Sequence, residues 1–271
     1  MALSLSLPSF LARRRRVVQR PPTSLSWYAT LALFGGCFVI WEVVSRLELL
    51  DPFIISRPSL IASAWTTQVE RGLFMRDLLA TLKEFGIGYG LAVVVGIVLG
   101  FAAGWYRRLR YSLEPLMWFF YNAPLIAFFP LLIVWFGVGT PTIVALSFIL
   151  AFFPIYLNTL AGVTLISPVL IDCARSFGGG TFSIFVHIAL PATVPAVVAG
   201  LRLGIGRALV GVVVGELIGG SAGFGYRMAY AANHVNATLY FVAFLATTVI
   251  GFVMTDILKR LEDRLHRYRT A

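Results

Sequence analysis

The amino-acid sequence predicts an all-α membrane protein that crosses the bilayer with six helices. Of its 271 residues, 59% are hydrophobic and only 13% are charged, whereas about a quarter of the residues in an average soluble domain carry a charge. Six stretches are apolar enough, and long enough or nearly so, to cross a hydrocarbon core that needs about 20 helical residues. The expected crossings are residues 27–44, 85–105, 116–136, 143–165, 195–218 and 239–257.

Basic residues indicate the orientation of these crossings. The net charge of +10 gathers in short runs beside apolar stretches: Arg13 to Arg16, then Arg107, Arg108 and Arg110, and finally Lys259 to Arg269. This pattern fits the retention of Lys and Arg on the cytoplasmic side of a membrane, and it differs from the continuous basic face of a nucleic-acid-binding protein. We expect a basic cytoplasmic segment over residues 1–26, a transmembrane domain over residues 27–258 and a basic cytoplasmic tail over residues 259–271.

The first apolar stretch superficially resembles a signal peptide, because a basic segment precedes it. It is long enough to span a membrane, and no small-residue cleavage site follows it cleanly. We therefore expect it to be a retained transmembrane helix, which places both termini inside.

Small residues and prolines recur within the expected crossings. Glycines lie four residues apart, a spacing that lets helix backbones approach closely in lipid, either within one subunit or between subunits. Prolines inside a crossing free backbone carbonyls, which indicates either kinks or residues that line a pathway. The glycines are Gly86 and Gly90, Gly96, Gly100 and Gly104, Gly200 and Gly204, and Gly211 and Gly215, and the prolines are Pro124, Pro130 and Pro154.

The connection over residues 167–191 is too polar for a crossing and too patterned for a slack linker. Its sequence predicts a short helix, a break at the three glycines Gly178 to Gly180, and a second short amphipathic helix that ends near Pro191. Phe182, Phe185 and Val186 would form an apolar stripe on this second helix.

This connection resembles the EAA signature of permease subunits from binding-protein-dependent ABC importers. The signature reads as an acidic residue, two small residues, three arbitrary residues, glycine, nine arbitrary residues, isoleucine, one arbitrary residue and Leu-Pro. The matching positions, without a gap, are Asp172, Cys173, Ala174, Gly178, Ile188, Leu190 and Pro191. Asp172 and Cys173 replace the usual glutamate and first alanine.

Further short matches extend the resemblance over most of the chain to permeases of the taurine, sulfonate and nitrate type. They are Trp41-Glu42, Thr81-Leu82, Pro130-Leu131, the run from Trp135 to Gly139, Gly215-Glu216-Leu217 and Gly223-Phe224-Gly225. The resemblance implies a type I ABC importer permease, with six transmembrane helices and a cytoplasmic coupling helix between the fourth and fifth. It also implies a location in the bacterial inner membrane and transport of a small anion such as a sulfonate, taurine or nitrate.

The resemblance assigns the connection to docking on a cytoplasmic ATPase. The residues implied in this coupling are Asp172, Cys173, Ala174, Arg175, Gly178, Phe182, Phe185, Ile188, Leu190 and Pro191. The implied partners are a second permease copy or a close homologue, two ATPase subunits and an external solute-binding protein. An amphipathic helix lying on the bilayer surface is the alternative for this segment.

Polar, aromatic and ionisable side chains within the crossings are candidates to line a translocation pathway, because ionisable groups are costly in a membrane. The pathway candidates are Asn122, Phe128, Phe129, Asn158, Arg202 and Glu216. For Arg202 we favour pairing with another helix over attraction of an anionic substrate, and for Glu216 a structural or gating contact near the outer surface. Glu42 and Arg46, one helical turn apart, are expected to satisfy each other.

The sequence shows no catalytic constellation. Cys37 and Cys173 lie in unlike environments, His187 and His234 lack partners at metal-ligand spacing, and no Walker-type phosphate loop appears. We expect no enzyme activity, no metal and no cofactor in this chain, with ATP and Mg²⁺ on the partner ATPase. The alternative function is an ion-coupled secondary transporter, although no internal repeat of the kind common in that class is evident, and a membrane-embedded enzyme is disfavoured.

Overall fold

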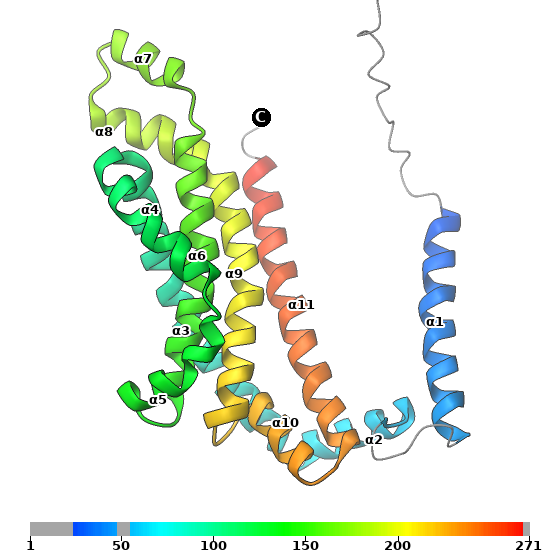
Figure 1. Cartoon of the computed structure of the whole chain (residues 1–271). Coiled ribbons are helices and arrows are strands. Elements are labelled where there is room, and N and C mark those ends of the chain that lie inside the picture. The colour runs from blue at the N-terminus through cyan, green and yellow to red at the C-terminus, as the bar shows by residue number, and fades with distance from the viewer. Residues whose placement is uncertain (1–23, 48–54, 268–271) are drawn as a thin grey trace, which may run out of the picture.

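The computed structural model describes residues 24–47 and 55–267, and within these ranges every regular element is a helix (Figure 1). The basic run at Arg13 to Arg16 and residues 268–271 of the expected tail lie outside the described residues. The elements are α1 (Ser24–Arg46), α2 (Pro58–Glu70), α3 (Leu73–Trp105), α4 (Arg107–Asn122), η1 (Leu125–Phe128), α5 (Phe129–Phe136), α6 (Thr140–Thr164), α7 (Pro168–Ser176), α8 (Thr181–Ile184), η2 (Phe185–Ala189), α9 (Leu190–Gly219), α10 (Phe224–Asn233) and α11 (Ala237–Arg267).

Helix α6 forms the centre of the fold and packs along both α3 and α9. Its apolar residues surround the whole helix rather than one stripe, which is the composition of a helix buried on all sides. Ile155 and Tyr156 in its middle are fully buried. Proline 154 lies inside α6 without ending it.

Glycines on α3 and α9 allow this close packing. A Cβ atom added at Gly100 would lie 2.6 Å from the Thr159 Cβ atom on α6, and one added at Gly211 would lie 2.7 Å from the Ser147 Cα atom. Packing within the subunit is thus confirmed for three of the predicted glycine groups: Gly96, Gly100 and Gly104, Gly200 and Gly204, and Gly211 and Gly215. The prediction of packing within the subunit is wrong for Gly86 and Gly90, because both face open space in this subunit.

The third expected crossing is not one continuous helix. The chain bends by 89° between α4 and the η1–α5 segment. The residue before a proline avoids the helical region, and Ala123, which precedes Pro124, is extended with φ −69° and ψ 147°. Within the described ranges, five helices are long and apolar enough to cross a membrane, and the bent pair would make a sixth.

The second crossing begins earlier than the sequence predicts. Helix α3 starts at Leu73 rather than near residue 85, so Asp77 and Glu84 belong to the helix and not to the preceding connection. Both side chains are buried. The last crossing is also longer than expected, because α11 continues to Arg267.

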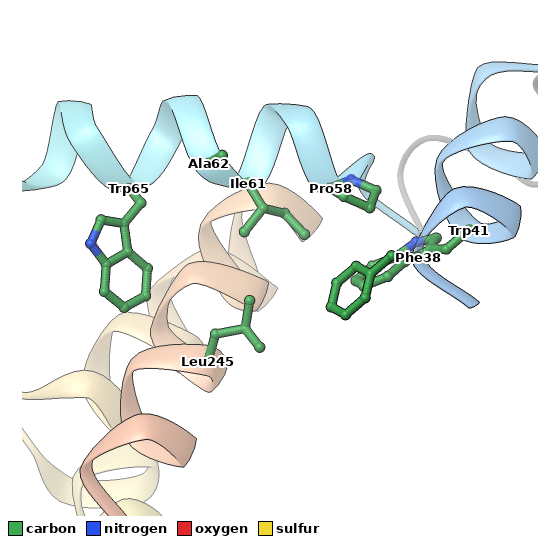
Figure 2. Close-up of a pocket in the computed structure, with 7 residues that line it drawn as sticks. All are labelled: Phe38, Trp41, Pro58, Ile61, Ala62, Trp65 and Leu245. Carbon is green, nitrogen blue, oxygen red and sulfur yellow. The ribbon is translucent and has the colours of Figure 1, made fainter. Parts of the chain in front are cut away.

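Helix α1 stands beside the bundle and contacts it mainly at one end (Figure 1). Figure 2 shows the apolar pocket there, of about 370 Å³, with Phe38 of α1, Ile61 and Trp65 of α2 and Leu245 of α11 around it. The expected pairing of Glu42 with Arg46 is confirmed, with Oε1 and Nε 2.7 Å apart. The Glu42 carboxylate also accepts hydrogen bonds from Ser59, so it joins α1 to the start of α2.

Candidate functional site

The connection between α6 and α9 projects from one end of the bundle as α7, a tight turn and α8 (Figure 1). We refer to residues 167–184 as the α7–α8 arm. Gly178 has φ +81°, a left-handed conformation that glycine adopts without steric cost. The amides of Gly178 and Gly179 donate 2.9 Å hydrogen bonds to the carbonyls of Arg175 and Ala174. These two bonds form the Schellman ending of a helix and give the arm a defined elbow.

Large apolar side chains on the arm are exposed. The exposed fraction is 74% for Val169, 87% for Phe177 and 80% for Phe182. Burying such a side chain is worth roughly 1.5–3 kcal/mol, and clustered exposed apolar groups mark interaction sites. Asp172 and Arg175 form an exposed ion pair, with 3.6 Å between Oδ1 and Nη1. The arm therefore offers an apolar surface with two charges that a partner can reach.

The seven signature positions divide between the two sides of the elbow. Asp172, Cys173 and Ala174 lie on α7, Gly178 is the left-handed residue after it, and the remaining positions, Ile188, Leu190 and Pro191, lie where the chain enters α9. The break at the glycines is confirmed, but the expected helix end near Pro191 is wrong. The chain stays helical from Thr181 to Gly219.

A π-helical turn over Phe185–Ala189 explains why Pro191 does not end the helix. A proline in a regular α-helix lacks an amide donor and clashes with the carbonyl four residues earlier, and a wider turn of this kind relieves that conflict. Here the amide of Leu190 donates to the carbonyl of Phe185 instead.

The base of the arm is anchored in the bundle. The Phe185 ring meets Trp105 edge-on at 5.4 Å between ring centroids and Phe101 at 5.7 Å, and both partners lie on the last turns of α3. The adjacent Ile184 is buried. The arm therefore leads directly into α9, and Phe185, the residue that follows it, packs against α3.

The opposite end of the bundle holds a buried polar network. Asp77 on α3 accepts hydrogen bonds from the amide of Gly223 at 3.2 Å and from Nε of Arg227 at 2.7 Å. The Glu216 carboxylate on α9 accepts 2.6 Å and 2.7 Å hydrogen bonds from the Thr81 hydroxyl and the Gly225 amide. Together these bonds fix α10 against α3 and α9.

Glu84 extends the network to α6. Its Oε1 accepts a 2.8 Å hydrogen bond from the Thr140 hydroxyl, and its carboxyl group lies next to that of Glu216. Asp77 and Glu84 precede the second crossing expected from the sequence, residues 85–105, so their burial was not predicted. Extending that helix toward residue 73 would have marked both as ionisable groups within a membrane helix, which are functional candidates by default.

The predicted pathway residues do not all face one space. Asn122 is exposed and donates to the Trp118 carbonyl of its own helix at 2.8 Å, and Phe128 is also exposed. Phe129 is buried among Leu132, Leu146 and Leu150. Asn158 lines a cavity between α4 and α6.

The two ionisable pathway candidates lie far apart on α9, separated by about 21 Å along the helix axis at 1.5 Å per residue. Arg202 forms an ion pair with Glu262 of α11, which confirms the favoured interhelical pairing. Glu216 is fully buried in the network described above.

Three comparisons with known proteins bear on this architecture. The family described as "Binding-protein-dependent transport system inner membrane component" matches residues 92–267. A probable ABC transporter permease of Brucella abortus is 32% identical over 203 residues, which cover 75% of this chain and 81% of the relative. The taurine transport system permease TauC of Escherichia coli is 27% identical over 256 residues, or 93% of each chain.

Among solved structures, the fold resembles a chain of the MetNI methionine ABC transporter in inward-facing conformations. The TM-score is 0.61 and the sequence identity 18%, over 70% of this chain and 94% of that one. The predicted all-α fold of an importer permease is thereby confirmed. The family match covers more than half of the sequence, so this chain belongs to the inner-membrane permease components of binding-protein-dependent ABC transporters.

Proposed function

We propose that this permease pairs with a second copy of itself, or with a close homologue, and that each α7–α8 arm docks on one cytoplasmic ATPase. The observation that carries the proposal is the exposed apolar surface of the arm, formed by Val169, Phe177 and Phe182, beside the signature positions Asp172 to Ala174 and Gly178. Val169, Phe177 and Phe182 gain from burial when a partner protein covers them. ATP and Mg²⁺ bind to the ATPase, and both termini of the permease lie in the cytoplasm.

The geometry of the arm suits the transmission of force. Its elbow is closed by two backbone hydrogen bonds, and its base runs without a break into α9. When ATP closes the two ATPases, the arm moves as a stiff lever and carries α9 and the end of α3 with it. The helices then alternate between openings toward either side of the membrane, while a solute-binding protein delivers its cargo at the α10 end.

For the pathway we retain the residues predicted from the sequence as proposals: Asn122, Phe128, Phe129, Asn158, Arg202 and Glu216. Asn122 and Phe128 are exposed in this subunit, and Asn158 lines the cavity between α4 and α6. Phe129 and Glu216 are buried, so their proposed role is to support the helices that line the pathway rather than to contact the solute.

We propose a small anion such as a sulfonate, taurine or nitrate as the solute. The support is the similarity to the taurine permease over 93% of both chains. Uptake of radiolabelled taurine by proteoliposomes containing the full transporter, with its binding protein outside, tests this. Competition by unlabelled alkanesulfonates and nitrate ranks the solutes, and uptake insensitive to all of these anions contradicts the proposed class.

The docking proposal is tested by substitutions on the arm. Val169→Asp places a charge in the apolar surface, and Gly178→Trp forces a side chain onto a left-handed residue. Val138→Asp is the matched control, since Val138 is similarly exposed, at 72%, and belongs to another connection. We expect both arm variants to lose co-purification of the ATPase and ATP-dependent uptake, while the control keeps both. Wild-type docking and uptake in both arm variants would contradict the proposal.

A further inference from the structure

A cavity of about 650 Å³ lies between α4 and α6, at the end of the bundle that carries the arm. This volume falls in the range of sites for small molecules. The lining is mixed, with two opposite charges, hydroxyl and amide groups and one indole, and the residues that the argument uses are Arg110, Tyr111, Glu114, Trp118 and Asn158.

Arg110 and Glu114 occupy the same face of α4, one helical turn apart, and both are partly buried. Among the described residues, neither forms an ion pair with any other side chain. The Arg110 guanidinium lies 5.4 Å from the centre of the Tyr111 ring, while its Nε is buried and has no hydrogen-bond partner in the described part of the chain. Two charges of opposite sign thus line one cavity.

Neutral polar groups complete the lining. Asn158 donates through Nδ2 to the carbonyl of Pro154 at 2.8 Å, which leaves its Oδ1 as an acceptor. A buried polar atom without a partner is unfavourable, and a polar ligand in the cavity would supply a partner to Nε of Arg110.

We propose that this cavity is a solute-binding site inside the permease and that it selects a small zwitterion, with Arg110 binding the oxyanion and Glu114 the ammonium group. This rests on the proposed function as an importer, and it narrows the proposed solutes to taurine, which carries an ammonium group as well as a sulfonate. A simple anion would be attracted by Arg110 but repelled by Glu114. A simple cation would be attracted by Glu114 but repelled by Arg110. A molecule that carries both charges a few bonds apart satisfies the two side chains together, and Trp118 covers its carbon skeleton.

The two charges therefore act as a filter at the inner end of the pathway. A guanidinium binds a sulfonate or carboxylate through paired N–H donors, and a carboxylate accepts ammonium protons. The α7–α8 arm lies at this same end of the bundle, so that motion of the arm can open the cavity for release.

The test uses the purified assembly of permease and ATPase in nanodiscs, without nucleotide and without the solute-binding protein. Ligand-observed saturation-transfer NMR measures the binding of taurine, of ethanesulfonate, which lacks the ammonium group, and of ethylammonium, which lacks the sulfonate. The variants are Arg110→Gln and Glu114→Gln, and the control is Arg108→Gln, an exposed arginine in the same turn that does not line the cavity.

We expect taurine to bind the wild type and the control alike, and to bind each cavity variant about tenfold more weakly, as the loss of one charged hydrogen bond predicts. Glu114→Gln should bind ethanesulfonate more tightly than the wild type does, and Arg110→Gln should bind ethylammonium more tightly. A purely structural role for these residues would produce neither gain.

The proposal is overturned if none of the three compounds binds the wild type, if ethanesulfonate binds it as tightly as taurine, or if taurine binding is the same in all variants. Such results leave the importer function intact, because docking of the ATPase on the arm and ATP-dependent uptake are measured separately.

Discussion

The hydroxyl of Thr81 on α3 donates a 2.6 Å hydrogen bond to Oε1 of Glu216 on α9, and the same hydroxyl oxygen accepts a 3.1 Å bond from the amide of Phe224. One buried side chain thereby connects three helices. Glu216 completes the arrangement by accepting from the amide of Gly225. The first turn of α10 is thus held from two sides by side chains of the bundle.

Replacing Thr81 with valine should weaken the α10 end of the bundle. The shape is preserved, but the Phe224 amide and one Glu216 oxygen lose their partner, which costs about 1–3 kcal/mol for each buried group. Thermal unfolding of the purified protein in detergent measures the change. Thr247→Val on α11 is the control, because its hydroxyl bonds only to the Ala243 carbonyl of its own helix, and an equal loss in both variants would contradict the role of Thr81.

Asp77→Asn should destabilise the protein far more than a similar change in an exposed ion pair. Asp77 and Arg227 are paired at 2.7 Å with side-chain exposures of only 3% and 13%, and removal of one partner from a buried pair costs about 3–5 kcal/mol. The matched control is Asp256→Asn, whose exposed pair with Arg260 on α11 is worth at most about 1 kcal/mol. Chemical denaturation in mild detergent compares the two, and equal effects would show that burial does not set the strength of the Asp77 pair.

Gly100→Ala and Gly90→Ala should change stability in opposite directions. An added methyl group at Gly100 would meet Thr159 at 2.6 Å, whereas one at Gly90 meets no atom within 4 Å. Overpacking at the α3–α6 contact costs about 1–3 kcal/mol, while alanine in an open helical position gains up to about 1 kcal/mol over glycine. The melting temperature of each variant, compared with that of the wild type, tests this prediction. A shift of the same sign in both variants would contradict the packing argument.

Phe185→Ala should uncouple the arm without removing the ATPase. The substitution deletes the ring that meets Trp105 and Phe101, but it leaves the exposed surface of α7 unchanged. We expect co-purification of the ATPase to persist and the solute imported per ATP hydrolysed to fall several-fold. Phe252→Ala on α11 is the control, since Phe252 is 73% exposed and distant in sequence from the arm. An unchanged ratio of solute imported to ATP hydrolysed in Phe185→Ala would show that this aromatic contact does not transmit motion from the arm to α3.

Local signals account for what the sequence predicted well. Apolar length indicated the crossings, the three glycines indicated the elbow at Gly178, and the spacing from Asp172 to Pro191 indicated the family before any geometry was known. Errors occurred where neighbouring turns or distant residues override a local rule. Pro191 predicts a helix end, yet the π-helical turn before it absorbs the proline, whereas Pro124 sits at a bend of 89° within an expected continuous crossing.

Long-range contacts account for the rest of the candidate site. Asp77 and Glu84 look like residues of an outer connection until their partners are known. Arg110 reads as one more basic residue at a membrane boundary until α6 is placed beside it and the cavity with Glu114 and Asn158 becomes visible.

The sequence by itself determined that this chain is a bundle of membrane helices with a patterned arm, because hydrophobic length, glycine breaks and motif spacing depend on residues close together in the chain. Only the tertiary structure decided which polar groups are paired. Thr81 and Glu216 are 135 positions apart, and no local propensity relates them. Their hydrogen bond exists because glycines let α3 and α9 pack closely on α6, and burial then makes an unpaired carboxylate too costly to leave.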